Sequence, residues 1–495
     1  MWRDWAALSL LMFPVLLVAV DNTALTFALP ATARTLDAGG VQLLWIIDAY
    51  PLVLAALLVT MGNLGDRIGR RRLLLIGSTG FAAISVATAF ATSPGLLIAG
   101  RALLGIFGAM LMPSTLSLIR NIFLEPNRRR LAVAIWAAGF SGGAALGPIF
   151  GGWLVEQFWW GAVFLVAAPL LLPLLALGPK LIPESRDGNP GKADIASVAL
   201  SILTMAAVVY GMKEAAIHGP ALLPALSFGV GLAAGVAFVR RQRRLESPML
   251  DVRLFRNATF STSITANVLS LFSMTGFIFF FAQHLQLIEG LTPMQAGISM
   301  IPALVATMAA GLLVVPLVRR VRPGTVVAAG LALSATGYLV VALGNHGNGP
   351  GFLLAALLIL AIGVGMAETI SNDLILGSVP AGKAGAASAI SETGYELGSL
   401  LGTAVLGSIL TASYQHNLRL PEQLSEESAG HASETLAGAV EAASTLPAST
   451  SDAVMAAART AFESGIHITA AIRLVLMATA AVLAAVVLRR VPVAD

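Results

Sequence analysis

Six carboxylic acids lie inside long apolar stretches of this chain, where charged side chains are not expected. They are Asp21, Asp48, Glu368, Asp373, Glu392 and Glu396. An ionised carboxylate within a hydrophobic layer is costly, so each acid is a candidate functional group by default. Only Arg101 is a clearly internal arginine, so several of the acids are expected to be unpaired. Such acids would be protonated part of the time near neutral pH, as proton exchange requires.

The spacing of these acids predicts which of them cooperate. Glu392 and Glu396 are four positions apart and would share one face of a helix. Two carboxylates this close repel, so a cation arriving there favours proton loss and an arriving proton favours cation release. Glu368 and Asp373 are five apart and do not share a face, and Asp373 is expected to be solvated. Asp21 and Asp48 would assist, with Asp48 placed toward the outer gate.

The surrounding composition is that of a membrane protein. Of 495 residues, 57% are hydrophobic and 11% are charged, whereas soluble domains carry about 25% charged residues. Mean hydropathy is +0.83. Apolar runs long enough to span a bilayer as helices occur fourteen times. They cover 8–30, 43–63, 73–91, 96–118, 131–154, 159–179, 194–212, 221–239, 260–283, 293–318, 324–344, 351–375, 386–411 and 467–489.

The basic residues predict the orientation of these helices. With the N-terminus inside, 24 of the 30 lysines and arginines fall in inner loops and termini and 4 in outer loops. This bias places both termini in the cytoplasm and the chain in the inner (plasma) membrane. Short basic clusters between apolar runs also argue against nucleic acid as a partner. The first run is too long for a signal-peptide core and is interpreted as an uncleaved helix.

One outer connection, 412–466, is long and acidic. It holds seven acids against two arginines, and stretches such as 451–464 are expected to form short helices with Ser451 or Asp452 as N-cap. The sequence leaves two interpretations open. The segment is either a solvated loop or an acidic vestibule that concentrates cations.

The loop after the second apolar run carries a recognisable signature. Gly62, Asp66, Arg67, Gly69 and Arg70 fit the pattern G-x-x-x-D-R-x-G-R-R, which resembles the signature of the major facilitator superfamily. Its glycines permit a tight turn between helices, and Asp66 is placed to cap the next helix or to pair with an arginine. The resemblance implies a gating latch between two halves of the molecule, not a substrate site.

A second motif lies in the fifth apolar run. Gly143, Gly147, Pro148, Gly151 and Gly152 match G-x-x-x-G-P-x-x-G-G, which is similar to the antiporter motif of exporters in that superfamily. Small residues every three or four positions allow another helix to approach closely, and Pro148 removes a backbone donor. Helix packing alone is the alternative interpretation, but the position in the fifth helix favours export.

Further segments narrow the resemblance to the fourteen-helix drug:proton antiporter family. Residues 21–30 are similar to its L-D-x-T-V-V-N-V-A-L-P pattern, with Thr26 in place of Asn, and 101–105 to R-x-x-Q-G, with Leu104 in place of Gln. Residues 45–50 and 391–398 look like the branch of QacA-, SmvA- and LfrA-type pumps. The resemblance implies a proton-relay role for Arg101, a buried structural arginine being the alternative. Some relatives place an acidic residue in the helix that corresponds to run 324–344, and this chain has none there. The model in which two sites bind a divalent cation therefore does not carry over to this chain.

Aromatic side chains are candidates to line a pocket in which cation–π contacts hold a ligand. The candidates are Trp45, Trp136, Phe140, Phe277 and Tyr395. Facing lipid or packing against neighbours is the alternative for each. The histidines show no metal-ligand spacing, the chain has no cysteine, and we expect no catalytic residue, no metal and no cofactor apart from protons as the coupling ion.

Together these features predict an all-α membrane protein with the major facilitator superfamily fold and fourteen transmembrane helices. Residues 1–190 would form an N-terminal six-helix bundle, 191–258 two inserted helices with a cytoplasmic linker, and 259–495 a C-terminal six-helix bundle carrying the loop 412–466. The predicted function is proton-coupled efflux of lipophilic cations such as quaternary ammonium compounds and dyes, with fluoroquinolones as a further candidate class. The protein would work as a monomer.

Two alternatives remain open at this stage. One is a facilitator that exports a single physiological substrate, such as a lipid or siderophore. The other is a membrane sensor that transports nothing. The intramembrane acids argue against the sensor, because a passive scaffold has no reason to keep six of them.

Overall fold

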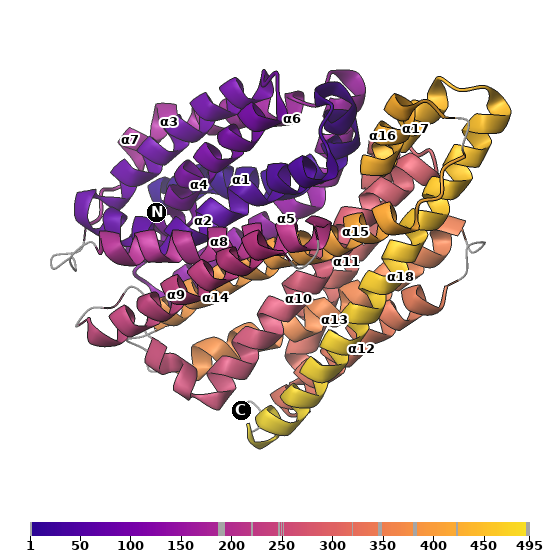
Figure 1. Cartoon of the computed structure of the whole chain (residues 1–495). Helices are drawn as coiled ribbons and strands as arrows, with labels where there is room; N and C mark the ends of the chain where they lie inside the picture. Colours follow the sequence, from indigo (N-terminus) through magenta and orange to yellow (C-terminus); the bar gives the residue numbers. More distant parts are fainter. Residues whose placement is uncertain are drawn as a thin grey trace.

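The computed structural model describes residues 2–186, 194–218, 221–245, 248, 250, 252–318, 320–344, 349–379, 384–421 and 424–491. These residues form helices and no strand (Figure 1). Thirteen helices among them are long and apolar enough to cross a membrane. α5 is not one of the thirteen, so the count of fourteen spans stays a prediction.

The N-half consists of α1 to α7. Its helices are α1 (Trp2–Leu36), α2 (Gly40–Ile68), α3 (Arg70–Ala89), α4 (Pro94–Ile122), α5 (Pro126–Gln157), α6 (Ala162–Leu165) and α7 (Ala167–Leu181). Within it α1 packs on α5, and α4 packs on α2 and α3. The helices α1 to α5 each cover most or all of a predicted apolar run, because in lipid a helix satisfies its own backbone hydrogen bonds. The run 159–179 is divided between α6 and α7.

The C-half begins at α10. Its helices are α10 (Ala258–Gln283), α11 (Pro293–Leu317), α12 (Pro323–Leu343), α13 (Gly349–Gly377), α14 (Ala384–Leu401), α15 (Gly407–Asn417), α16 (Glu426–Glu434), α17 (Leu436–Ser444) and α18 (Ala448–Val487). Short turns at Val252–Arg256 and Leu488–Arg490 flank these helices. A π-helical turn at His284–Ile288 follows α10. A second π-helical turn, Gly402–Leu406, joins α14 to α15, so the predicted run 386–411 is not one regular helix.

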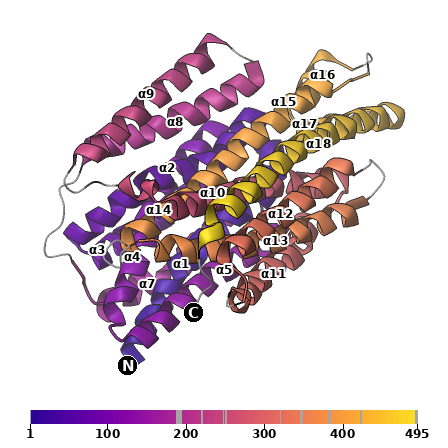
Figure 2. The same ribbon diagram turned by 90° about the horizontal axis from the view of Figure 1, so that it is seen from below.

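α8 (Ile195–His218) and α9 (Leu222–Arg244) pack on each other at one edge of the molecule (Figure 2). α8 contacts α2 of the N-half and α15 of the C-half, so it lies along the junction between them. At the end of this pair, Arg241 donates to Asp194 at 2.8 Å. Hydrogen bonds from Arg241 lower the pKa of the Asp194 carboxyl to about 2. The pair therefore stays ionised throughout the physiological pH range.

Segment 412–466 is more ordered than the predicted loop. The expected short helix at 451–464 is instead the first part of the 40-residue helix α18, which begins after Pro447. This stretch is rich in alanine, a strong helix former. It also buries Val454, Ala458, Ala461 and Phe462, whose spacing forms one helical face. α16 and α17 complete the segment, which packs as folded structure.

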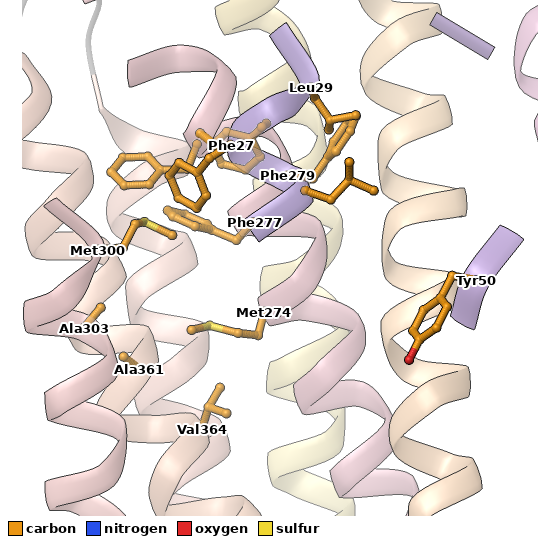
Figure 3. Close-up of a cluster of buried hydrophobic side chains, with 14 of the residues drawn as sticks. Phe27, Leu29, Tyr50, Met274, Phe277, Phe279, Met300, Ala303, Ala361 and Val364 are labelled. Carbon is orange, nitrogen blue, oxygen red and sulfur yellow. The ribbon is translucent and has the colours of Figure 1, made fainter. Parts of the chain in front are cut away.

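The two termini lie at one end of the molecule, and α16 and α17 lie at the opposite end, here called the insert end (Figures 1 and 2). The two halves meet along a seam, which we define as the packing of α1, α2 and α5 on α10, α11 and α14. Phe27 of α1 and Phe277, Phe279 and Met300 of the C-half belong to one cluster of buried hydrophobic side chains (Figure 3). This apolar cluster includes side chains from both halves.

Glycines of α5 make the closest approaches at the seam. A Cβ at Gly151 would lie 2.7 Å from the Ala24 carbonyl oxygen of α1, and one at Gly152 would lie 2.5 Å from the Pro293 carbonyl oxygen of α11. Gly143 and Gly147 are similarly tight against α1. The predicted antiporter motif therefore packs on two sides, against its own half and against the other half.

The close approach at Gly152 gives a test of this packing. We expect Gly152→Leu to separate α5 from α11, because backbone atoms of α11 occupy the space that a side chain needs. The chain has no native cysteine, so a Met294→Cys background allows thiol labelling from the insert end without other sites. Labelling should become faster with Gly152→Leu.

Gly142→Leu is the matched control, because nothing lies within 4 Å of a Cβ built at Gly142. Equal labelling rates in the two leucine variants would show that the α5–α11 approach does not close the insert end.

Candidate functional site

Asp21 and Arg101 form a buried ion pair between α1 and α4. Arg101 Nη1 donates to Asp21 Oδ2 at 2.6 Å, and the two side chains are 3% and 8% exposed. Arg101 Nε donates to the Ile46 carbonyl oxygen at 3.2 Å, and the guanidinium lies 4.5 Å from the centre of the Tyr50 ring. The Asp21 charge is therefore neutralised, because a paired and hydrogen-bonded arginine faces it.

Glu368 of α13 and Glu392 and Glu396 of α14 form a cluster of three acids, all half-buried. Glu392 interacts electrostatically with both Glu368 and Glu396. Among the described residues, no lysine, arginine or histidine forms an ion pair with any of the three. Carboxylates that repel one another are harder to ionise together, and a bound proton or cation relieves the repulsion.

Tyr50 of α2 connects the buried pair to the cluster. Its ring is fully buried, and it interacts electrostatically with Asp21 in the N-half and with Glu396 in the C-half. Figure 3 shows its hydroxyl pointing away from the α2 ribbon. α2 packs on α14 at this level of the seam. The predicted acids Asp21, Glu368, Glu392 and Glu396 thus belong to one polar zone that spans both halves.

Tyr395 lies inside this zone, where its hydroxyl is hydrogen-bonded to Glu368. The same hydroxyl accepts a hydrogen bond from Asn372 Nδ2 at 2.5 Å. Asn372 is in turn bonded to Asn267 and Ser391. We did not single out Asn267, Asn372 or Ser391 from the sequence, because uncharged polar residues in an apolar run carry no distinctive signal. Only the fold brings α10, α13 and α14 together around Glu368.

The two remaining predicted acids differ in burial. Asp48 is fully buried in α2, whereas Asp373 is exposed near the end of α13. The exposure of Asp373 agrees with its expected solvation. It lies five residues from Glu368, and the two side chains differ accordingly in burial.

The predicted pocket aromatics divide into two groups. Trp45, Trp136, Phe140 and Tyr395 are half-buried, and Trp136 stacks on Phe140 with ring centres 6.4 Å apart. Trp136 Nε1 also donates to Thr115 Oγ1 of α4 at 3.2 Å. These four side chains are partly exposed, and a role in a pocket remains a prediction.

Phe277, the fifth candidate, is fully buried inside the C-half. It packs against Tyr338 and Phe281, at ring distances of 6.2 and 5.5 Å. The guanidinium of Arg473, which is also buried, lies 5.1 Å from the Phe280 ring and 5.7 Å from the Tyr338 ring. Phe277 therefore belongs to the aromatic packing around Arg473.

The predicted gating motif joins α2 to α3 at the end of the molecule that holds the termini. Gly69 has φ of +109°, a conformation that favours glycine. The predicted cap does not come from the motif, since Gly69 itself is the N-cap of α3. Instead Glu184, which follows α7, accepts a hydrogen bond from the Arg71 N–H at 3.0 Å. The Asp66 side chain lies outside the described residues.

Arg70 and Arg71 also bind the chain that follows α7. The Arg70 side chain donates to Ser185 Oγ at 3.2 Å, and Arg71 donates to the Ile182 carbonyl oxygen at 2.9 Å. Gly62 and Arg67 are half-buried in the last turns of α2. These hydrogen bonds stay within the N-half, so a latch between the halves at this motif remains a prediction.

Among the described residues, no group of three or more histidine, aspartate or glutamate side chains is placed to hold a metal ion.

Comparisons with known proteins agree with this architecture. The family model "Major Facilitator Superfamily" matches residues 11–403. The chain is 53% identical to the multidrug efflux pump LfrA of Mycolicibacterium smegmatis, over 99% of this chain and 97% of that protein. It is 37% identical to the methyl viologen resistance protein SmvA of Salmonella typhimurium, over 93% and 94% of the two chains.

Among solved structures, a bacterial homologue of the human lysosomal transporter Spinster has a similar fold. Its TM-score is 0.70 at 18% sequence identity, and the match covers 99% of this chain and 98% of that one. At this identity the likeness concerns the fold alone.

The Asp21–Arg101 pair gives a stability prediction. Arg101→Met leaves Asp21 buried without its partner, and breaking a buried pair costs about 3–5 kcal/mol. We expect a clear fall in the melting temperature of the purified protein. Adding Asp21→Asn should recover most of the loss, because the double variant has no unpaired charge.

Arg128→Met is the control for this comparison of the single and double variants. Its partner is Glu125, and both side chains are about half exposed, so its loss should change stability by less than about 1 kcal/mol. If the single and double variants at the buried pair melted alike, the two charges would not be coupled.

Proposed function

Because the chain belongs to the major facilitator superfamily, we propose that it is a drug efflux transporter that exports lipophilic cations in exchange for protons. The observation that carries this proposal is the half-buried cluster of Glu368, Glu392 and Glu396 at the seam. The names of the relatives support it. LfrA is a multidrug efflux pump. SmvA is a methyl viologen resistance protein, and methyl viologen is a doubly quaternary cation.

The first step is cation binding. Three neighbouring carboxylates that form no ion pair with an arginine or lysine among the described residues attract positive charge. Trp45, Trp136, Phe140 and Tyr395 offer aromatic surface for the apolar part of the ligand and for cation–π contacts. Binding of the cation stabilises ionised carboxylates, so protons leave the cluster as the drug arrives.

The second step is release in exchange for protons. When the site faces the side of higher proton concentration, protons neutralise Glu392 and Glu396 and remove the attraction for the cation. Bound protons and bound drug therefore compete for the same carboxylates of the cluster. This competition couples the two flows, and it needs no covalent step and no cofactor apart from the protons.

Alternating access supplies the change of side. The tight α5–α11 approach at Gly152 supports an insert end that is closed in this conformation, so the site would open toward the termini. The excess of basic residues in loops on the side of the termini supports a cytoplasmic location for that end. The inferred state is inward-facing, in the inner membrane, with the transporter working as a monomer.

Transport into vesicles tests this proposal. We expect purified protein in vesicles to accumulate ethidium when a pH gradient is imposed and to stop when a protonophore removes the gradient. Glu392→Gln and Glu396→Gln should each lower accumulation about tenfold or more, equivalent to about 1.4 kcal/mol of lost coupling. The reason is that a glutamine neither ionises nor releases a proton.

Glu156→Gln is the matched control, because Glu156 is exposed near the end of α5. Normal proton-driven accumulation in both cluster variants would refute the assignment of the coupling site. Accumulation that ignores the pH gradient in the unaltered protein would refute antiport itself, and export of neutral compounds alone would favour a narrow substrate.

A further inference from the structure

A hydrogen-bonded chain of uncharged side chains approaches the acid cluster from inside the C-half. Asn267 Nδ2 of α10 donates to Asn372 Oδ1 of α13 at 3.1 Å. Ser391 Oγ of α14 donates to the same oxygen at 2.9 Å. In this arrangement the Asn372 amide oxygen accepts two hydrogen bonds, so its Nδ2 group faces Tyr395.

This orientation decides what Asn372 presents to Tyr395. The Asn372 Nδ2 group, which can only donate hydrogen bonds, lies 2.5 Å from the Tyr395 hydroxyl oxygen. Tyr395 therefore accepts from Asn372 and has one hydrogen left to donate. Its second partner is Glu368, so the tyrosine hydrogen points to that carboxylate.

The direction of these bonds distinguishes Glu368 from its neighbours. A protonated Glu368 can still accept the tyrosine hydrogen through its carbonyl oxygen. An ionised Glu368 accepts the same hydrogen more strongly, because hydrogen bonds to a charged acceptor are the stronger kind. Tyr395 is not described as bonded to Glu392 or Glu396, which lack this support.

We propose that Asn372 is a positioning residue that, through Tyr395, keeps Glu368 as the standing anion of the cluster, so that Glu392 and Glu396 carry the exchanged protons. This division of labour rests on the proposed cation–proton exchange and deepens it. Glu368 attracts the cation in every cycle, and the other two acids respond to it. Asn372 itself touches neither drug nor proton.

Other ionisable groups around Glu368 are few. From α14, Glu392 and Tyr395 face it. α10 and α11 carry no acidic, basic, tyrosine or histidine residue within their bounds, and α12 carries only Tyr338, which packs beside Arg473. On α13 itself the other acid is Asp373, which is exposed. A change in pH response on altering Asn372 therefore reports on Glu368 and its α14 neighbours.

The test is the pH profile of cation binding to the full-length protein in lipid nanodiscs. Tetraphenylphosphonium is the probe, because its charge does not change with pH. We expect Tyr395→Phe to move the midpoint of the low-pH loss of binding toward neutral by about one pH unit, since it removes about one hydrogen bond to a charged group. Asn372→Leu should move the midpoint in the same direction, because the tyrosine hydroxyl loses the donor that orients it. Affinity at high pH should change little.

Two further variants keep the test decisive. Asn372→Asp preserves shape but replaces the donor with an acceptor, so it should shift the midpoint in the same direction even if Asn372→Leu does not fold. Thr369→Val is the matched control. Thr369 neighbours Glu368 on α13, and its hydroxyl bonds only to the Gly365 carbonyl oxygen of its own helix among the described contacts.

Midpoints equal to that of Thr369→Val in all three network variants would overturn the role of Asn372. A uniform loss of affinity at every pH would also overturn it, because that would indicate a merely structural residue. Failure of the proposed function would look different. In that case the unaltered protein would bind tetraphenylphosphonium with no dependence on pH, or would not bind it.

Discussion

Neutralisation of carboxylates away from water is the constraint on which the rest of this structure depends. Asp21 is neutralised within the protein, by Arg101 at 2.6 Å. Glu368, Glu392 and Glu396 have no such partner among the described residues. Because isolated negative charge is costly there, the proposed exchange supplies their neutralising charge from outside the chain as a proton or a cation. A fixed pair and an open cluster thus lie on the two sides of one seam.

The packing of the two halves determines where that exchange takes place. α5 uses a row of glycines against α1 and Gly152 against α11, so a single helix joins the interior of the N-half to the surface of the C-half. The tight approach at Gly152 and Gly297 leaves no room for side chains. Such a contact is either closed or broken, which suits a molecule that alternates between two states. The acid cluster lies on α13 and α14, outside this contact.

Much of this arrangement followed from local patterns. Helical periodicity placed Glu392 and Glu396 together, and apolar runs located most spanning helices to within a turn or two. Tertiary contacts explain what the sequence did not reveal. Glu368 reaches Glu392 only because α13 packs beside α14, and Glu184 caps α3 from a segment more than a hundred residues away. Segment 412–466 folds because of a buried face that its acidic composition concealed.

Proton release on drug binding tests the central claim most directly. Purified protein in nanodiscs, in weakly buffered solution with a pH indicator, would receive tetraphenylphosphonium. The account predicts that the solution becomes more acidic in proportion to the drug bound, and that a variant carrying Glu392→Gln and Glu396→Gln releases no protons. Drug binding by the unaltered protein with no release of protons would contradict it.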